Sequence, residues 1–123
     1  MKINDNEVMI ELDGKHFHCA MDLTMHFIGG KWKTVVLWYL QKDKKRYSEL
    51  RKLMPYITER MLSIQLRQLE EDGLIQREVF TTKPPLKVEY SLTDFGKTLI
   101  PVLMDIAKWG RNVGEKKGKM VEI

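Results

Sequence analysis

The strongest constraint on the fold is a change of hydrophobic period at Gly73. Before this glycine, the segment 58–72 has the pattern of an amphipathic helix that Thr58 can cap and Gly73 can end. One face of that helix carries three leucines: Leu62, Leu66 and Leu69. After the glycine, the segments 74–82 and 87–92 are β-rich, and the loop between them contains two prolines. The sequence therefore predicts a helix followed by a β-hairpin.

A shorter helical segment comes before residue 58. Ser48 can cap it, and three apolar residues share one of its faces: Leu50, Leu53 and Met54. Pro55 lies just past its end, so a short turn separates the two helices, as in a helix-turn-helix. The segment 31–40 is apolar on nearly every side, which predicts a buried helix at the centre of the core. The order of these elements predicts a mainly α winged helix-turn-helix with a small β-hairpin wing.

Further elements are predicted at the two ends of the chain. Residues 8–19 alternate around an Asp-Gly dipeptide that is typical of a hairpin turn, and a short helix is predicted over 21–28. Near the other end, Thr93 can cap a long helix that Pro101 should kink or split.

The composition fits a single folded domain, with 43% hydrophobic and 31% charged residues in 123. We divide the chain into an N-terminal arm with a hairpin (1–18), a winged helix-turn-helix domain that includes the dimerisation helices (19–110) and a C-terminal tail (111–123). No apolar run is long enough for a membrane span, and the N-terminus lacks the apolar stretch of a signal peptide. We therefore expect a cytoplasmic protein without a membrane partner.

The outward face of the helix over 58–72 carries side chains that suit DNA recognition. They lie at its capped end and along the face opposite the leucines: Thr58, Arg60, Ser63, Ile64 and Arg67. Arginine can pair bidentately with guanine, and an exposed isoleucine can pack on a thymine methyl group. A charged face that is merely solvated is the alternative, but an exposed isoleucine between two arginines fits a groove-reading face better.

Basic and hydroxyl-bearing residues also stand where a winged helix would meet phosphates. They lie before and at the start of the first motif helix and at the wing tip: Lys42, Lys44, Lys45, Arg46, Tyr47, Ser48, Lys83 and Lys87. The net charge of +4 is modest, so the joint placement of these residues carries more weight than their number. Any single lysine among them has a solvated surface position as an equal alternative.

Six short motifs occur along the chain in the order expected for one known family. They are Gly29-Gly30-Lys31-Trp32, Arg46–Leu50, Ile57-Thr58, Leu66–Ile75, Glu89–Thr93 and Trp109-Gly110. Together they resemble the HxlR-type winged helix-turn-helix transcriptional regulators, a MarR-like family. The resemblance implies a repressor or activator that binds double-stranded DNA as a homodimer on a pseudo-palindromic operator, with no cofactor. Several members respond to oxidants, quinones or aldehydes, which implies a small-molecule or electrophile inducer.

Cys19, the only cysteine, matches the N-terminal cysteine that serves as the sensing thiol in redox-responsive members of this family. It precedes a predicted helix N-terminus, where the helix dipole favours a thiolate, and Lys15, His16 and His18 stand nearby. Ala20 replaces the proline that commonly follows this cysteine in the family. The resemblance therefore implies redox sensing through Cys19, with an unreactive cysteine buried at the dimer interface as the alternative.

The apolar stripe of the last helix is longer than one small domain needs for its own core. We expect part of it to be shared with a second subunit, together with the helix over 21–28. The candidate interface residues are Phe27, Leu99, Leu103, Ile106 and Trp109. A dimer of this kind would place two recognition helices about 34 Å apart, which is one turn of DNA. Ordinary packing within one chain is the alternative.

Three other classes of function fit the sequence less well. His16, His18, Cys19 and His26 could suggest a metal site, but there is no second cysteine and no CxxC pair. A catalytic triad, a phosphate-binding glycine loop and a carboxylate pair are all missing from the sequence, so we expect no enzyme and no catalytic residues. A winged-helix protein-interaction or adaptor module without sequence-specific DNA binding remains the alternative function.

Overall fold

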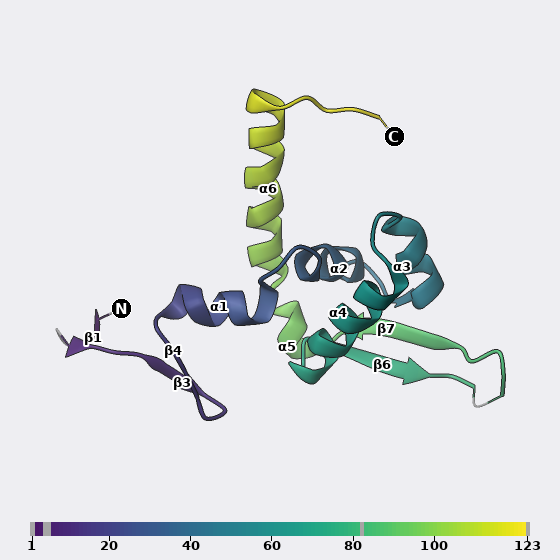
Figure 1. Cartoon of the computed structure of the whole chain (residues 1–123), viewed down its shortest axis with the longest axis horizontal. Coiled ribbons are helices and arrows are strands. Elements are labelled where there is room, and N and C mark those ends of the chain that lie inside the picture. The colour runs from purple at the N-terminus through teal and green to yellow at the C-terminus, as the bar shows by residue number, and fades with distance from the viewer. Residues whose placement is uncertain (1, 4–5, 82, 123) are drawn as a thin grey trace.

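The chain folds around one hydrophobic core, with a β-hairpin arm at one end and a long helix that rises away from the body at the other (Figure 1). The structure is a computed structural model that describes residues 2–3, 6–81 and 83–122. Its elements in chain order are β1 (Lys2–Ile3), β2 (Asn6–Glu7), β3 (Ile10–Leu12), β4 (Lys15–Phe17), α1 (Ala20–Ile28), α2 (Lys33–Leu40), β5 (Lys45–Arg46), α3 (Tyr47–Leu53), α4 (Glu59–Glu71), β6 (Ile75–Val79), β7 (Val88–Leu92), α5 (Asp94–Lys97) and α6 (Ile100–Lys117). The predicted winged helix-turn-helix is confirmed: α3 and α4 form the motif, and β6 and β7 form the wing.

Leucines of α2, α3 and α4 form the centre of the core. Four of them have no exposed surface: Leu37, Leu50, Leu62 and Leu69. Full burial of a leucine side chain stabilises a fold by about 1.5–3 kcal/mol, so this cluster fixes how the three helices pack. The predictions that α2 lies at the centre of the core and that the leucine face of α4 points inward are both confirmed.

The wing belongs to a three-stranded antiparallel sheet in the order β5–β7–β6. Ile75 of β6 lies opposite Leu92 of β7, and Arg46 of β5 lies opposite Glu89 on the other edge of β7. The strand β5 was not predicted, because two residues carry no periodicity of their own. It exists through its pairing with β7, a contact between residues distant in the sequence.

The start of α3 differs from the prediction that Ser48 caps this helix. The N-cap residue is Arg46, which ends β5 with an extended backbone, so the helix begins at Tyr47 and Ser48 lies in its first turn. Leu53 also departs from the prediction, since it is exposed while Leu50 and Met54 are buried. The sheet pairing of β5, rather than a hydroxyl cap, sets where α3 begins.

The C-terminal helix is split, as Pro101 predicts. Thr93 caps the short helix α5 by accepting a hydrogen bond from the backbone N–H of Gly96 at 2.9 Å, and Pro101 lies in the first turn of α6. Helix α6 continues to Lys117, beyond the point where the sequence predicts a loose tail. Within the described residues, no helix has both the length and the apolar character that crossing a bilayer requires.

The N-terminal arm contains the predicted hairpin. Ile10 of β3 pairs with Phe17 of β4, and the two turn residues, Asp13 and Gly14, have positive φ angles of 51° and 78°. Positive φ at both positions is the geometry of a tight two-residue hairpin turn. A second, outer ribbon of β1 and β2 precedes it, in a stretch where the sequence predicts no element. Phe17 is buried and anchors the arm to the rest of the molecule.

A close approach at Gly96 holds α5 against the turn after α4. A Cβ at this position would overlap the carbonyl oxygen of Leu74, and that same oxygen accepts a hydrogen bond from the Thr93 backbone N–H at 3.1 Å. We expect Gly96→Ala to lower the free energy of unfolding by about 1–3 kcal/mol, because backbone must move to admit the methyl group. Urea unfolding followed by circular dichroism measures this change.

The matched control is Gly110→Ala in the middle of α6, where an added Cβ meets nothing within 4 Å. Alanine favours a helix interior over glycine by up to about 1 kcal/mol, so this variant should be as stable as the parent or more stable. Equal destabilisation by the two alanines would show that the contact at residue 96 does not constrain α5.

Candidate nucleic-acid interface

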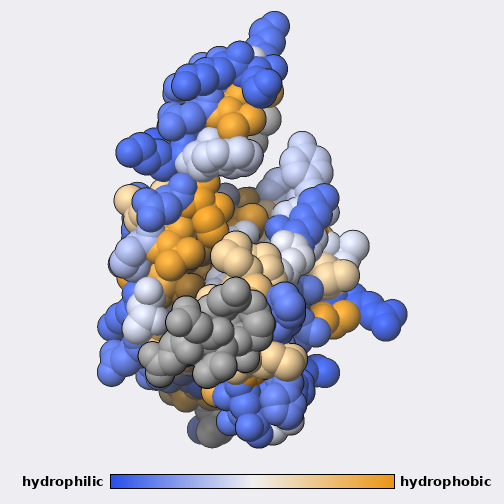
Figure 2. All heavy atoms as spheres, turned by 90° about the vertical axis from the view of Figure 1, so that its left-hand side faces the viewer, coloured by the Kyte–Doolittle hydropathy of each residue, from blue (hydrophilic) through white to orange (hydrophobic). Residues whose placement is uncertain are grey.

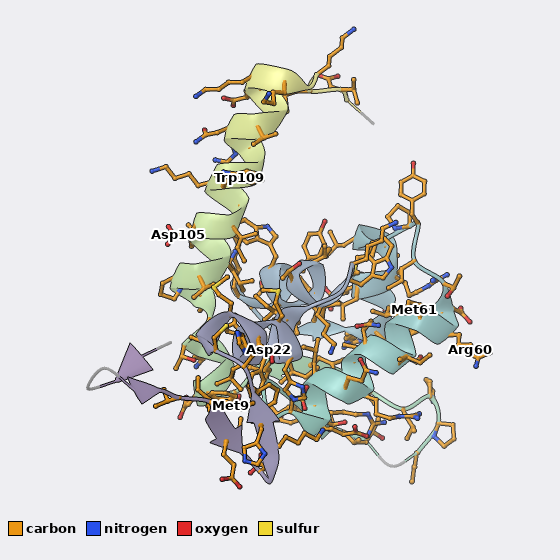
Figure 3. The ribbon with its side chains drawn as sticks, turned by 60° about the vertical axis from the view of Figure 1, so that its left-hand side comes forward. Met9, Asp22, Arg60, Met61, Asp105 and Trp109 are labelled. Carbon is orange, nitrogen blue, oxygen red and sulfur yellow. The ribbon has the colours of Figure 1, made fainter. Side chains whose placement is uncertain are left out.

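Helix α4 presents a polar face to solvent along the side of the molecule opposite its leucines. Arg60, Ser63 and Arg67 are exposed on this face, and Figure 3 shows Arg60 near one end of α4, directed away from the body. Thr58 is the N-cap, as predicted, and its hydroxyl oxygen accepts a hydrogen bond from the Met61 backbone N–H at 3.1 Å. The cap fixes the first turn, which is the part of a recognition helix that meets base edges.

Ile64 does not match the prediction of an exposed apolar contact, because the structure leaves it only partly accessible. The neighbouring Met61 has a larger exposed fraction, 37%, although the sequence did not single it out. The apolar part of this face is therefore shared by two side chains, and exposed arginines lie on either side of it.

The starts of α3 and α4 are tied together by polar contacts. The hydroxyl of Tyr47 donates a hydrogen bond to the carbonyl oxygen of Glu59 at 3.2 Å, so this predicted site residue bridges the two helices. Arg51 donates from Nη1 to the carbonyl oxygen of Ile57 at 2.6 Å and holds the turn between them. Ser48 stays exposed in the first turn of α3. These contacts fix the angle at which α4 leaves the motif.

A groove with a volume of about 300 Å³ runs between α4 and the wing sheet. It brings together three residues predicted for the site, Tyr47, Ser63 and Arg67. It also adds Arg77 of β6, which lies opposite Tyr90 in the sheet and which the sequence analysis did not select. Arg77 reaches the groove through the register of the β6–β7 pairing, and the sequence alone does not show that register.

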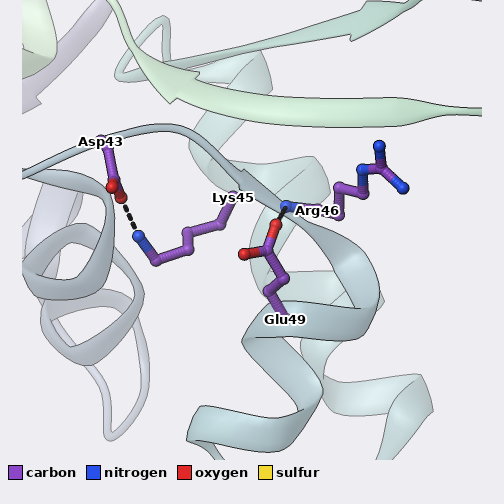
Figure 4. A network of polar contacts seen from close by, with 4 residues as sticks. All are labelled: Asp43, Lys45, Arg46 and Glu49. Atoms are coloured by element: carbon purple, nitrogen blue, oxygen red, sulfur yellow. Dashed lines mark hydrogen bonds and ion pairs between the residues drawn. The ribbon is translucent and has the colours of Figure 1, made fainter.

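The basic segment 42–46 before α3 (the linker) offers less uncompensated positive charge than the sequence predicts, because two of its lysines contact carboxylates. Figure 4 shows Lys45 in contact with Asp43, and Lys44 Nζ lies 3.4 Å from Glu89 Oε2 in β7. The backbone N–H of Arg46 donates to Glu49 Oε1 at 2.9 Å in the same view, while its guanidinium extends away. Arg46 and Lys42 are exposed cations of this segment, Lys44 is exposed but lies beside the Glu89 carboxylate, and Lys45 is partly buried.

The wing collects positive charge around one aromatic ring. Lys83 and Lys87 are both exposed, as predicted, and Lys87 Nζ lies 5.8 Å from the centre of the Phe80 ring. Lys44 Nζ approaches the same ring to 5.5 Å from the linker side. The Phe80 backbone N–H donates to the carbonyl oxygen of Lys87 at 2.8 Å, which extends the pairing of β6 and β7 by one residue toward the wing tip.

Cys19 is partly buried and is the N-cap residue of α1, with an extended backbone. The positive surroundings predicted for it are weaker than expected. Asp22 in the first turn of α1 accepts a hydrogen bond from the His18 backbone N–H at 2.9 Å, and His16 lies 3.8 Å from Glu11. In the part of the chain that the structure describes, no group of three or more His, Cys, Asp or Glu side chains is placed to hold a metal ion.

The residues predicted for a subunit interface divide into two groups. Phe27, Leu99 and Leu103 pack within the chain, and the Phe27 ring meets the Phe95 ring edge-on at 5.5 Å. Ile106 and Trp109 of α6 are instead 44% and 72% exposed. Figure 3 places Trp109 on the part of α6 that stands clear of the body, and Figure 2 shows apolar surface on the body below this part of the helix.

Apolar residues of α1 and α6 outside these predictions are also exposed: Met21, Met25, Val102 and Met104. A monomeric soluble protein rarely leaves large apolar patches open to water, so this many exposed apolar side chains on two helices suggest a partner. The two end helices therefore carry the main unpartnered apolar surface of the described chain.

Comparison with known proteins identifies related chains over most of the length. An HxlR-like helix-turn-helix family model matches residues 27–118. The Bacillus subtilis (strain 168) protein named uncharacterized HTH-type transcriptional regulator YdeP is 51% identical over 102 residues, which cover 83% of this chain and 79% of YdeP. The similarly named YybR from the same organism is 48% identical over 94 residues, covering 76% of this chain and 74% of YybR.

Solved structures with the same fold include the redox regulator HypR in two states. The oxidized form has a TM-score of 0.73 and 44% identity, covering 84% of this chain and 100% of that chain. The reduced form has a TM-score of 0.74 and 45% identity, covering 77% of this chain and 93% of that chain.

Proposed function

Since the chain belongs to the HxlR-like helix-turn-helix family and is a DNA-binding transcriptional regulator, we propose that it binds a pseudo-palindromic operator as a homodimer, with α4 of each subunit in the major groove. The resemblance seen in the sequence is thereby confirmed at the level of the family. The exposed, arginine-bearing face of α4, opposite a fully buried leucine face, is the observation that carries the proposal.

Base recognition is assigned to the outward face of α4, from its capped end to Arg67. Arg60 and Ser63 lie close to the capped end, and Arg67 follows about two turns beyond Arg60 on the same face. The guanidinium groups can pair with guanine, while the partly accessible Ile64 offers a smaller apolar contact to thymine. Arg77 extends the same surface across the groove to the wing sheet.

Phosphate contacts are assigned to the start of α3 and to the wing. Arg46 and Ser48 stand at the N-terminus of α3, where backbone N–H groups and the Ser48 hydroxyl suit an anion, while Tyr47, whose hydroxyl donates to Glu59, holds the start of α4 beside them. Lys83 and Lys87 of the wing contact phosphates on the other side of α4. Because Lys44 and Lys45 already contact carboxylates, they contribute less than Arg46 does.

A mobility shift at increasing salt concentration distinguishes this function from a protein-interaction module. Each phosphate that the protein neutralises adds about −0.9 to the slope of log affinity against log salt concentration. A regulator with the proposed contacts gives a steep slope and prefers its selected operator to a scrambled duplex. An adaptor module that does not contact DNA gives neither result.

Lys83→Ala should weaken binding to the operator and to a scrambled duplex by the same factor, because a wing lysine at a phosphate reads no base. We expect the salt slope to fall in magnitude by about 0.9. Fluorescence anisotropy titrations at several salt concentrations measure both quantities. Lys108→Ala, an exposed lysine of α6, is the control and should leave the slope unchanged. A Lys83→Ala variant that loses affinity for the operator alone would assign this residue to base recognition instead.

The homodimer is proposed to form through α1 and α6. The support is the exposed apolar surface of these helices, with Ile106 and Trp109 at its centre, together with the need of a pseudo-palindrome for two recognition helices. Phe27, Leu99 and Leu103 act indirectly, since they pack α1, α5 and α6 onto the core and so orient that surface.

Oxidation of Cys19 is proposed to change operator affinity. The support is the placement of Cys19 at the start of α1, one of the proposed dimer helices, and the similarity of this chain to the redox regulator HypR. A change in the chemical state of the thiol at this position would alter how α1 packs, and through α1 the spacing of the two recognition helices.

Diamide is reduced as it converts two thiols to a disulfide, and with one cysteine per chain the bond that forms links the Cys19 thiols of two subunits. This treatment should change the operator affinity of the parent protein by about fivefold or more. Cys19→Ser should bind with the affinity of the reduced protein and show no response. Anisotropy titrations, with mass spectrometry to count modified thiols, follow both effects. If the oxidised parent, with its thiol fully converted, binds like Cys19→Ser, the thiol is not a sensor.

A further inference from the structure

A cavity of about 260 Å³ lies where the N-terminal arm, α1, the end of α4 and α5 meet. It is separate from the α4 face proposed for DNA and from the apolar surface of α6. The family match begins at residue 27, so the β3–β4 hairpin that forms one wall lies outside the matched part of the chain.

Aromatic rings form a continuous row along the cavity. The rings of Phe17 and His26 have their centres 5.2 Å apart, those of His26 and Phe27 also 5.2 Å, and those of Phe27 and Phe95 5.5 Å. The planes of neighbouring rings are inclined by 56° to 82°, so the rings are not stacked face to face. Ring faces carry partial negative charge and attract cations, while the ring side chains of the lining can also accommodate apolar substituents of a ligand.

The charged residues of the lining are mainly acidic. Asp13, Glu71 and Asp72 contribute three carboxylates, against the single ammonium group of Lys15. His26 Nε2 lies 4.0 Å from Asp72 Oδ1, so one carboxylate is partly engaged. This local excess of negative charge occurs in a chain with a formal net charge of +4. It would repel DNA phosphates, and it therefore has no part in the DNA-binding surface.

The chemistry of the lining narrows the class of ligand. An anion would be repelled by these carboxylates, and a neutral apolar molecule would gain nothing from their charge. A metal ion does not fit, because in the described part of the chain no three carboxylate or imidazole groups are placed to share one. Aromatic faces combined with separated carboxylates are the pattern that binds ammonium groups with apolar substituents.

We propose that this cavity binds a small organic cation, in which an ammonium group is carried on an apolar body. The rings of Phe27 and Phe95 contact the apolar substituents, and Glu71 and Asp72 neutralise the charge from the end of α4. The proposal concerns binding to the free protein and does not depend on the DNA contacts proposed above.

Choline is a suitable probe, and its neutral isostere, in which a tert-butyl group replaces the trimethylammonium group, is the matched control ligand. Titration of the full chain is followed by ¹H–¹⁵N NMR. We expect saturable shifts of the Asp13, His26 and Asp72 amides with choline, and affinity for the isostere about tenfold lower or weaker. Equal affinity for the two molecules, or shifts scattered away from the cavity, would overturn the proposal.

Two variants test the two kinds of contact separately. Glu71→Gln removes a charge at an exposed position, and Phe95→Leu removes a ring that is half exposed, so neither disrupts the core. Each should raise the dissociation constant for choline by about threefold or more. Glu115→Gln, which makes the same charge change near the far end of α6, should have no effect. An unchanged dissociation constant in both cavity variants would contradict the assignment of the site.

Discussion

Arg60→Ala is expected to lower the affinity for the operator by about 1–3 kcal/mol, which corresponds to a loss of about 5- to 150-fold. The reason is geometric: Arg60 is exposed near the capped end of α4, and its guanidinium can pair with a base edge in two hydrogen bonds. A lost bidentate contact also relaxes the preference at one base pair of each half-site. Competition assays against operators altered at every position measure both effects.

Arg111→Ala in α6 is the control for that experiment, because it removes the same charge from an exposed position away from α4. It should change affinity only slightly and should leave base preference intact. If Arg60→Ala instead weakens binding to every sequence equally, like the wing variant Lys83→Ala, the arginine contacts a phosphate and the assignment of base recognition to this end of α4 is wrong.

Trp109→Glu should convert the protein to a monomer with the 14.5 kDa mass of one chain. The side chain is 72% exposed in the isolated subunit, so a charged residue can be accommodated there without disturbing the core. In a dimer the same carboxylate would be buried against apolar surface, which costs several kcal/mol. Because the second half-site then binds independently, operator affinity should fall by about 10²- to 10⁴-fold.

Sedimentation velocity gives the mass, and anisotropy gives the affinity. Leu53→Glu serves as the control for the mass measurement, since it places the same charge on an exposed leucine of α3, outside the α1 and α6 surface. Leu53→Glu should remain a dimer. A Trp109→Glu protein that stays dimeric, with the melting temperature of the parent, would move the subunit interface away from α6.

The elements that the sequence predicts well are those whose signals are local. Thr58 and Thr93 cap helices through hydrogen bonds to residues three positions later, and Gly73 ends α4 with a positive φ angle. The leucine face of α4 follows from helical periodicity alone. Each of these features depends on a few neighbouring residues, which a single sequence displays directly.

The features that were missed depend on contacts between distant segments. Strand β5 exists only because it pairs with β7, and that pairing moved the start of α3 from Ser48 to the residue after Arg46. Arg77 joined the candidate interface through the same sheet. Two-residue strands and cross-sheet neighbours leave no periodic trace in one sequence, so reasoning from spacing cannot find them.

The predicted interface residues of α6 show the same contrast between what local sequence tells and what only the fold tells. The stripe along α6 was correctly read as apolar, yet its pattern does not tell which members pack inside the chain. Leu103 is buried in the core, whereas Ile106 and Trp109, less than two turns further along α6, are exposed. The difference arises because α6 leaves the body after its first turns (Figure 1), and only the fold shows where that happens.

The central claim is that the outward face of α4 enters the major groove of the operator twice, once from each subunit. The most direct test is an iron chelate tethered to Ser63→Cys in a Cys19→Ser background, which cleaves DNA only next to the modified residue. The claim predicts two clusters of cleavage, centred roughly 10 base pairs apart in the two half-sites. Cleavage spread along the duplex, or absent while the labelled protein remains bound, would contradict it.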